Sequence, residues 1–319
     1  MTARSARRRL NKQKAARTKA VISPPPTSQG HASILTLPFE LIRRIFVRID
    51  MSEALQYRLI CRLVNTCLGD PYYAQVLITY NILKDASFAE KCKYMWFQWP
   101  YLFQKGLIPL IASRFCPVNT FDMATLNLTG RIPVCISELT NLTNLNLGAN
   151  KLSGPIPSSL SALTSLETLD LESNNLSGTL PLFLFTHPAL SFINLAKNLF
   201  SGPLPPDIFT RNLTLTTIKL NNNNLSGPLP SSFRNLRALE HLDLSHNQLC
   251  GRLPPSLGSL SRLKVLRLSK NRFIGHIPSE FGKLKNLEVL DLGKNVFSGL
   301  LPMELGGLLV LEILMAAIN

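Results

Sequence analysis

Apolar positions in the C-terminal two-thirds of the chain follow a pattern that repeats every 24 residues, with one step of 25. Within each period two leucines alternate with a polar residue, as in Leu145-Asn146-Leu147, and further leucines then recur at three-residue intervals. Alternation with a period of two predicts a short strand with one buried face. Self-similarity at this period predicts a solenoid of stacked units, because one unit cannot bury its own apolar face.

Two columns of special residues accompany the leucines. A Gly and a Pro three residues apart recur eight times, from Gly130 and Pro133 to Gly299 and Pro302, and an Asn follows the predicted strand in the units after the first. A buried amide can both donate to and accept from the backbone of adjacent turns. We therefore interpret the Asn column as structural. It comprises Asn150, Asn174, Asn198, Asn223, Asn247, Asn271 and Asn295.

The unit Leu-Thr-Asn-Leu-Asn-Leu-Gly-Ala-Asn-Lys-Leu-Ser-Gly-Pro-Ile-Pro, residues 142–157, resembles the plant-type leucine-rich repeat of receptor ectodomains and polygalacturonase-inhibiting proteins. The resemblance covers about residues 118–319. It implies an α/β solenoid, a right-handed horseshoe of about eight repeats whose strands line one concave sheet, with the last repeat incomplete. Three departures stand out: Leu126 replaces the first Asn, His187 replaces a leucine, and one extra residue precedes Leu215.

The first 33 residues are a basic tail. The net charge of +15 is concentrated here, because eight Lys and Arg occur among the first 19 residues before any acid. Such runs are typical of disordered, solvated arms; nuclear import, binding to an acidic surface and a mitochondrial presequence are the alternatives. The first 20 residues contain no apolar region of the secretory type. The sequence therefore favours a cytoplasmic or nuclear protein, with the cell surface or secretion as the alternative.

Residues 34–84 predict a small all-α unit. Leu-Pro-Phe-Glu-Leu at 37–41, with Arg-Leu-Ile-Cys-Arg at 58–62, resembles the F-box. The resemblance implies binding to a Skp-type adaptor and a cullin within a ubiquitin ligase, while Ala54 and Val64 depart from the family pattern. The alternative is a helical cap that shields the first repeat. The matched adaptor-binding positions are Leu37, Pro38, Leu41, Ile45, Ile60 and Cys61.

Residues 85–117 are rich in aromatic side chains, from Tyr94 to Phe103. Aromatic residues bury large areas, so we expect this segment to join the helical unit to the first repeat; an exposed partner site is the alternative. The apolar stretch at 305–318 is too short to span a membrane. The six cysteines lack the paired spacing of a zinc site or disulfide cap, which predicts reduced thiols.

Several kinds of chemistry find no support in the sequence. No nucleophile with a base, metal cluster or phosphate-binding loop stands out, so we predict no enzymatic activity, cofactor or metal, and we do not expect nucleic-acid binding. Five N-x-S/T sequons occur, but three of them, at Asn127, Asn175 and Asn224, are produced by the repeat consensus itself. The sequons therefore carry little weight as evidence for secretion.

The predicted function is protein recognition. The exposed strand positions are expected to include Ser245, Ser269 and Gly293, and also a cationic set of Lys264, Arg267 and Lys270. Carboxylates in the adjacent strands either neutralise this cationic set or leave it free to hold an acidic or phosphorylated peptide. The main hypothesis is a substrate-recognition subunit of a cullin-based ubiquitin ligase, and the alternative is a receptor-like or inhibitor-like binding protein. The candidate target-binding residues are Lys219, His241, His246, Lys264, Arg267 and Lys270.

Overall fold

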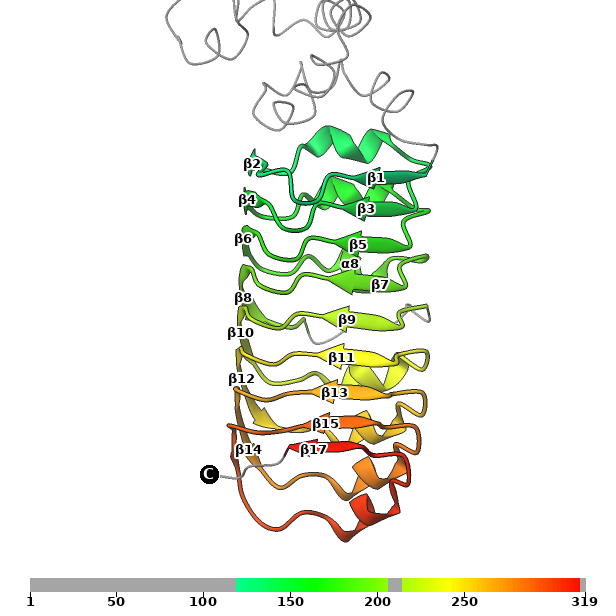
Figure 1. The fold of residues 1–319 in the computed structure, drawn as a ribbon, viewed down its shortest axis with the longest axis vertical. Coiled ribbons are helices and arrows are strands. Elements are labelled where there is room, and N and C mark those ends of the chain that lie inside the picture. Colours follow the sequence, from blue (N-terminus) through cyan, green and yellow to red (C-terminus); the bar gives the residue numbers. More distant parts are fainter. Residues whose placement is uncertain (1–118, 206–213, 316–319) are drawn as a thin grey trace, which may run out of the picture. The chain divides into compact units, whose positions relative to one another are not determined.

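The computed structural model describes residues 119–205 and 214–315 (Figure 1). The predicted basic tail, the F-box-like unit with its six adaptor-binding positions and the aromatic segment all lie outside the described residues. The repeats are stacked one on another, and each contributes equivalent elements at equivalent places (Figure 1). The described part of the chain is therefore a solenoid, as the 24-residue period predicts.

The first sheet has nine parallel strands, one from each repeat, in the order of the sequence. Its strands hold the alternating leucines: Leu145 and Leu169 are fully buried, whereas Asn144 and Asn146 on either side of Leu145 are half-buried. The sheet therefore has one face in the core and one face open. It consists of β1 (Thr120–Asp122), β3 (Asn144–Asn146), β5 (Thr168–Asp170), β7 (Phe192–Asn194), β9 (Thr217–Lys219), β11 (His241–Asp243), β13 (Val265–Arg267), β15 (Val289–Asp291) and β17 (Ile313–Met315).

A second parallel sheet, which was not predicted from the sequence, is formed by the segment after each Asn. Each of its strands runs toward the repeat's glycine, which adopts a positive φ, for example +80° at Gly154. Glycine tolerates this conformation because it has no Cβ. The eight strands are β2 (Thr129–Gly130), β4 (Lys151–Gly154), β6 (Asn175–Gly178), β8 (Leu199–Pro203), β10 (Asn224–Gly227), β12 (Gln248–Arg252), β14 (Arg272–Gly275) and β16 (Val296–Phe297).

Helices are few and short among the described residues, so the expected α/β solenoid contains far more strand than helix. In most repeats a proline, such as Pro157, precedes five residues of 3₁₀ helix, and the following leucine ends them. A 24-residue repeat that supplies two strands leaves room for little more than one helical turn. The helical segments are η3 (Val134–Glu138), η4 (Ser158–Ala162), α8 (Phe183–Thr186), η5 (Ser231–Asn235), η6 (Pro255–Ser259), η7 (Ser279–Lys283) and η8 (Met303–Gly307).

The Asn column joins each repeat to the one before it. Asn174 Oδ1 accepts a hydrogen bond from the backbone N–H of Leu152 at 2.9 Å, and its Nδ2 donates to the carbonyls of Leu147 at 3.0 Å and Leu171 at 3.2 Å. The same pattern recurs at Asn223, which is 7% exposed. These amides therefore satisfy backbone groups that are buried between repeats.

Two of the departures from the repeat consensus lie within the stack. At the first, the backbone N–H of Leu126 donates to Asn150 Oδ1 at 3.0 Å, so the neighbouring repeat's Asn serves the unit that lacks its own. At the second, His187 is buried at 3% exposure and its Nε2 lies 2.9 Å from the carbonyl oxygen of Leu163. Burial lowers the pKa of His187 below its usual value.

Candidate interaction surface

The open face of the first sheet carries a column of residues along its strands. Parallel pairing places successive members beside one another, so that Lys219 lies between Asn194 and Asp243, and Arg267 between Asp243 and Asp291. Adjacent strands are about 5 Å apart, which brings these side chains within reach of one another. The charges of the column therefore interact across repeats, and the column divides into three parts.

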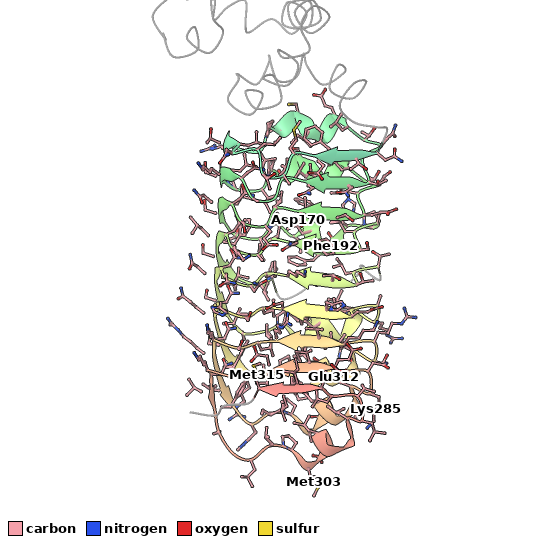
Figure 2. The ribbon with its side chains drawn as sticks, viewed as in Figure 1. Asp170, Phe192, Lys285, Met303, Glu312 and Met315 are labelled. Carbon is pink, nitrogen blue, oxygen red and sulfur yellow. The ribbon has the colours of Figure 1, made fainter. Side chains whose placement is uncertain are left out.

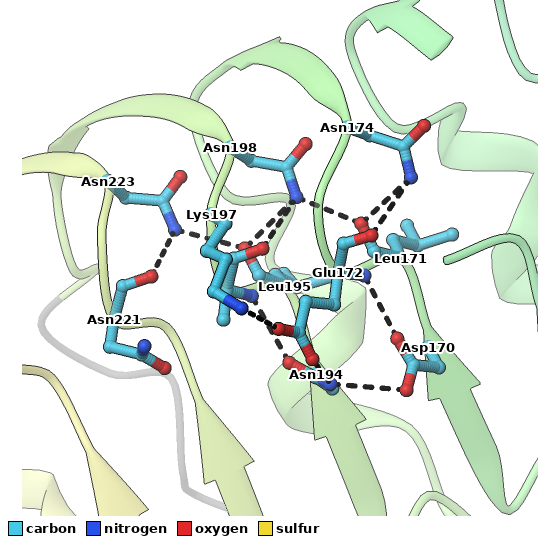
Figure 3. Close-up of polar contacts among 11 residues, drawn as sticks. Asp170, Leu171, Glu172, Asn174, Asn194, Leu195, Lys197, Asn198, Asn221 and Asn223 are labelled. Carbon is cyan, nitrogen blue, oxygen red and sulfur yellow. Dashed lines mark hydrogen bonds and ion pairs between the residues drawn. The ribbon is translucent and has the colours of Figure 1, made fainter. Parts of the chain in front are cut away.

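The part nearest the N-terminus of the stack is a closed polar network (Figure 3). Asn194 Nδ2 donates to Asp170 Oδ2 at 3.1 Å and to Glu172 Oε2 at 2.9 Å, and Lys197 Nζ lies 2.7 Å from Glu172 Oε1. The hydrogen bond to Lys197, assisted by that to Asn194, lowers the pKa of Glu172, and the same contact raises the pKa of Lys197. These acidic groups already have partners within the fold.

The central part is formed by Lys219 and Phe192. Lys219 Nζ lies 5.8 Å from the centre of the Phe192 ring, an arrangement that attracts a cation to an aromatic face. Within the described residues no carboxylate forms an ion pair with Lys219, although the register places Asp243 beside it. An exposed cation next to a half-buried aromatic ring is available to a ligand that has both an anionic and an apolar group.

The third part contains the cationic set predicted from the sequence. Lys264 Nζ lies 2.8 Å from Glu240 Oε2, which lowers the pKa of Glu240 and raises the pKa of Lys264. Arg267 Nη1 lies 3.8 Å from Asp243 Oδ2, at the limit of an ion pair, and the Arg267 side chain remains 47% exposed. Neighbouring carboxylates therefore neutralise Lys264 closely and Arg267 loosely.

The remaining predicted residues lie at two different places on this face. His241 begins β11 and is half-buried beside Val265 and Thr217. His246 and Lys270 are exposed and hold the position before the Asn, where φ is +56° and +53°. Lys294 occupies the equivalent position in the next repeat with φ +55°. The periodicity marks it as exposed, but it was not among the candidate target-binding residues. His246, Lys270 and Lys294 thus form one edge along the ends of the strands, to which the two lysines give positive charge.

Three positions that were expected to be exposed are buried, so this expectation from the sequence was wrong. Ser245 is 7% and Ser269 8% exposed, and Gly293 is buried as well. Ser245 Oγ donates to Asp243 Oδ1 at 2.7 Å, and Ser269 Oγ donates to Asp291 Oδ2 at 2.5 Å. The chain turns inward toward the Asn at this point, so these residues orient the central carboxylates and do not face solvent.

Neither metal binding nor a membrane span finds structural support in the part of the chain that is described. Among residues 119–205 and 214–315 there is no group of three or more His, Cys, Asp or Glu side chains arranged to hold a metal ion. A search of the same residues found no helix with the length and hydropathy needed to cross a bilayer. The open face of the first sheet is therefore the candidate site, and its chemistry is that of recognition.

Sequence models of the leucine-rich repeat family match residues 141–163, 165–186, 188–249 and 261–317. The matches cover 164 of the 319 residues, and the chain belongs to the leucine-rich repeat proteins. No F-box domain was detected. A comparison with curated protein sequences found no significant match.

Solved structures of plant receptors resemble the stack. The chain is 34% identical to the plant peptide hormone receptor RGFR1, solved in complex with RGF2, over 60% of this chain and 31% of that one, with a TM-score of 0.59. It is 36% identical to the ectodomain of the Arabidopsis receptor kinase HAESA, solved with an N-terminally extended IDA peptide hormone, over 63% of this chain and 33% of that one, with a TM-score of 0.59. The chain thus spans about a third of the length of these receptors.

A protein of another kind also resembles the chain. A plant ice-binding protein is 34% identical over 56% of each chain, with a TM-score of 0.50. The same repeat architecture therefore occurs in proteins with unrelated ligands, and function has to be inferred from the exposed residues.

Proposed function

We propose that the open face of the first sheet binds an extended peptide or protein segment whose acidic groups contact Lys219, Arg267 and Lys270. The observation that carries the proposal is the unequal pairing along the face. The acids of β5 and the segment after it are engaged in hydrogen bonds and an ion pair within the fold, whereas Lys219 and Lys270 form no ion pair with a carboxylate among the described residues, and Lys219 attracts Glu172 only at longer range. Cations without an ion-pair partner can form charge-assisted hydrogen bonds to a ligand, and the ordered backbone of the sheet adds no ordering cost beyond that of the side chains.

The two receptor structures support this choice of ligand class. One is a peptide hormone receptor solved in complex with RGF2, and the other was solved with a peptide hormone ligand. Each shares at least 34% identity with the chain across the matched part. On this basis we favour a receptor-like binding protein over a ligase subunit, and with it the cell surface or secretion over the cytoplasm or nucleus. The chain's proposed activity is binding, with no chemical step.

The ligase hypothesis remains a second candidate, and it rests on residues 37–62 alone. Their resemblance to the F-box would place the target on the repeats and the adaptor on the N-terminal unit. Co-purification of the full chain with a Skp-type adaptor and a cullin would support it, and replacement of Leu41 and Ile45 by Asp should abolish that co-purification. Failure of the unmodified chain to recover any adaptor would eliminate the hypothesis.

A photo-cross-linking experiment tests the preferred function. Benzoylphenylalanine is introduced in place of Phe192, on the open face, or in place of Leu182, which is 53% exposed and lies just ahead of α8. Both variants are exposed to native extract, irradiated and examined by mass spectrometry. We expect a discrete adduct with a peptide or protein segment at position 192 and none at 182. Equal adduct yields at the two positions would refute binding on the first sheet.

A further inference from the structure

A second cationic surface lies away from the candidate site, along the 3₁₀ helices and the turns that follow them. Five exposed Lys and Arg occur there in three consecutive repeats. We call this set the basic ridge. It comprises Arg234, Arg237, Arg262, Lys283 and Lys285.

The three repeats of the basic ridge are in direct contact. Ser256 Oγ donates to the carbonyl of Ser231 at 3.1 Å, and Asn286 Nδ2 donates to the carbonyl of Ser261 at 2.7 Å. Stacking of η5 on η6 and of η6 on η7 therefore places the five side chains in the helical layer of three adjacent repeats, where Arg237 and Lys285 hold equivalent positions. Figure 2 shows one member, Lys285, at the margin of the stack, away from Met315 in the first sheet.

The charges of the basic ridge are only weakly compensated, through the electrostatic attraction between Arg262 and the Glu240 carboxylate. Within the described residues no carboxylate forms an ion pair with any of its five members, and the one polar contact, from Lys285 Nζ to the carbonyl of Gly307 at 3.1 Å, leaves the charge in place. The equivalent segments of three earlier repeats, 134–141, 158–165 and 182–189, contain no Lys or Arg. The repeat architecture therefore does not require cations at these positions.

The surroundings of the basic ridge define the shape of its partner. Glu240 and Glu288 follow the turns on the side of the first sheet, whereas Glu280 and Glu304 lie within η7 and η8, and Glu280 packs closely against Gly258 of η6. A broad anionic body, such as a bilayer or a duplex, would meet these carboxylates as well as the cations. A narrow chain meets fewer of these carboxylates than a broad body does.

The segments that carry the basic ridge expose no aromatic ring, and this narrows the class of partner that the ridge can bind. In segments 231–238, 255–262 and 279–286 the aromatic residues are Phe233 and Phe281, which are buried at 1% and 0% exposure. Single-stranded nucleic acids are commonly held by stacking of bases on exposed aromatic rings, and these segments expose none. The groups between the cations are small and polar, such as Ser259 and Ser261. They suit hydrogen bonding to carboxylates.

We propose that the basic ridge is a docking surface for an extended acidic polypeptide segment. Its three arginines each present a planar donor pair that matches a carboxylate. The surface is separate from the open face of the first sheet, so a partner can occupy it while the proposed peptide ligand occupies the other face. Neither proposal depends on the other.

Carbodiimide cross-linking of the full chain to polyglutamate tests the proposal with residue resolution, because the reagent joins lysine amines to carboxylates in contact with them. We expect mass spectrometry to locate cross-links at Lys283 and Lys285. In the variant Arg234→Gln, Arg237→Gln, Arg262→Gln, which keeps both lysines, their yield should fall about tenfold, as three lost surface charge pairs predict. Cross-links at Lys151 and Lys294, outside the ridge, should not change.

Two results would overturn the proposal. One is a yield at Lys283 and Lys285 no higher than at Lys151, or unchanged in the arginine variant, with thermal unfolding showing that the variant is folded. The other is stronger competition by single-stranded DNA or by phosphatidylserine vesicles than by unlabelled polyglutamate, which would assign the ridge to a nucleic acid or a membrane.

Discussion

Residues 119–205 and residues 214–295 share one backbone plan but differ sharply in charge. Each region contains five Asp and Glu, whereas the first contains three Lys and Arg and the second contains twelve. The strands, the Asn column and the buried leucines are the same in both. The inner columns therefore determine the fold, and the outer positions of the second region can carry many cations without changing it.

Replacement of a column Asn should have the largest effect, and the same effect in both regions. Asn174→Leu and Asn223→Leu each leave buried backbone groups without partners, at a cost of about 1–3 kcal/mol in free energy of unfolding. Chemical denaturation measures the loss. The exposed neighbour Asn224, changed to Leu, is the control and should alter stability little. A loss confined to one region would show that the two do not share a scaffold.

Replacement of a glycine in the helical layer should destabilise the fold most in the second region. A Cβ at Gly258 would overlap the carbonyl oxygen of Glu280, so Gly258→Ala should destabilise the fold by about 1–3 kcal/mol through overpacking. Gly306, at the equivalent position of η8, is the matched control, because a Cβ there meets nothing within 4 Å. Equal unfolding temperatures for the two variants would contradict the close packing of η6 on η7.

The free energy of unfolding should depend on acid pH through His187, which lies in the first region. Its pKa is lowered in the folded state, so the unfolded chain binds the proton more readily. The contribution of His187 to stability is therefore constant above the unfolded pKa of about 6.5 and falls as the pH drops from there toward the folded pKa. His187→Leu, which restores the repeat consensus, should remove this part of the pH dependence of unfolding. An unchanged pH profile in the variant would exclude His187 as its source.

The sequence predicted the inner columns well because burial is periodic. Leu145, Leu147 and Asn150 recur with equivalents in repeat after repeat, and the buried strand positions lie where the alternation places them. The second sheet was missed because Lys-Leu-Ser-Gly contains a single buried side chain and shows no alternation. Ser245 and Ser269 were assigned to the wrong environment, because their burial depends on the inward turn before each Asn.

The residues of the candidate site could be predicted from the sequence, whereas the ion pairs that they form with neighbouring carboxylates could not. The repeat period places Lys264, Arg267 and Lys270 on one face, but only the three-dimensional structure shows that Glu240 engages Lys264 while Lys270 stays without a carboxylate partner in the described stack. Whether the six positions from Leu37 to Cys61 bind an adaptor stays a prediction, since they lie outside the described residues.

Capture of the ligand by two charge-reversed variants tests most directly whether the cations of the open face bind an acidic segment. One variant carries Lys219→Glu, Arg267→Glu and Lys270→Glu, and the other carries Glu167→Lys, Asp170→Lys and Glu172→Lys, with benzoylphenylalanine at position 192 in both. The yield of the position-192 adduct is measured by mass spectrometry against the unmodified surface. We predict that the basic-set variant loses the adduct and that the acidic-set variant largely keeps it. Equal loss in both, or no loss in the basic-set variant, would contradict binding through these cations.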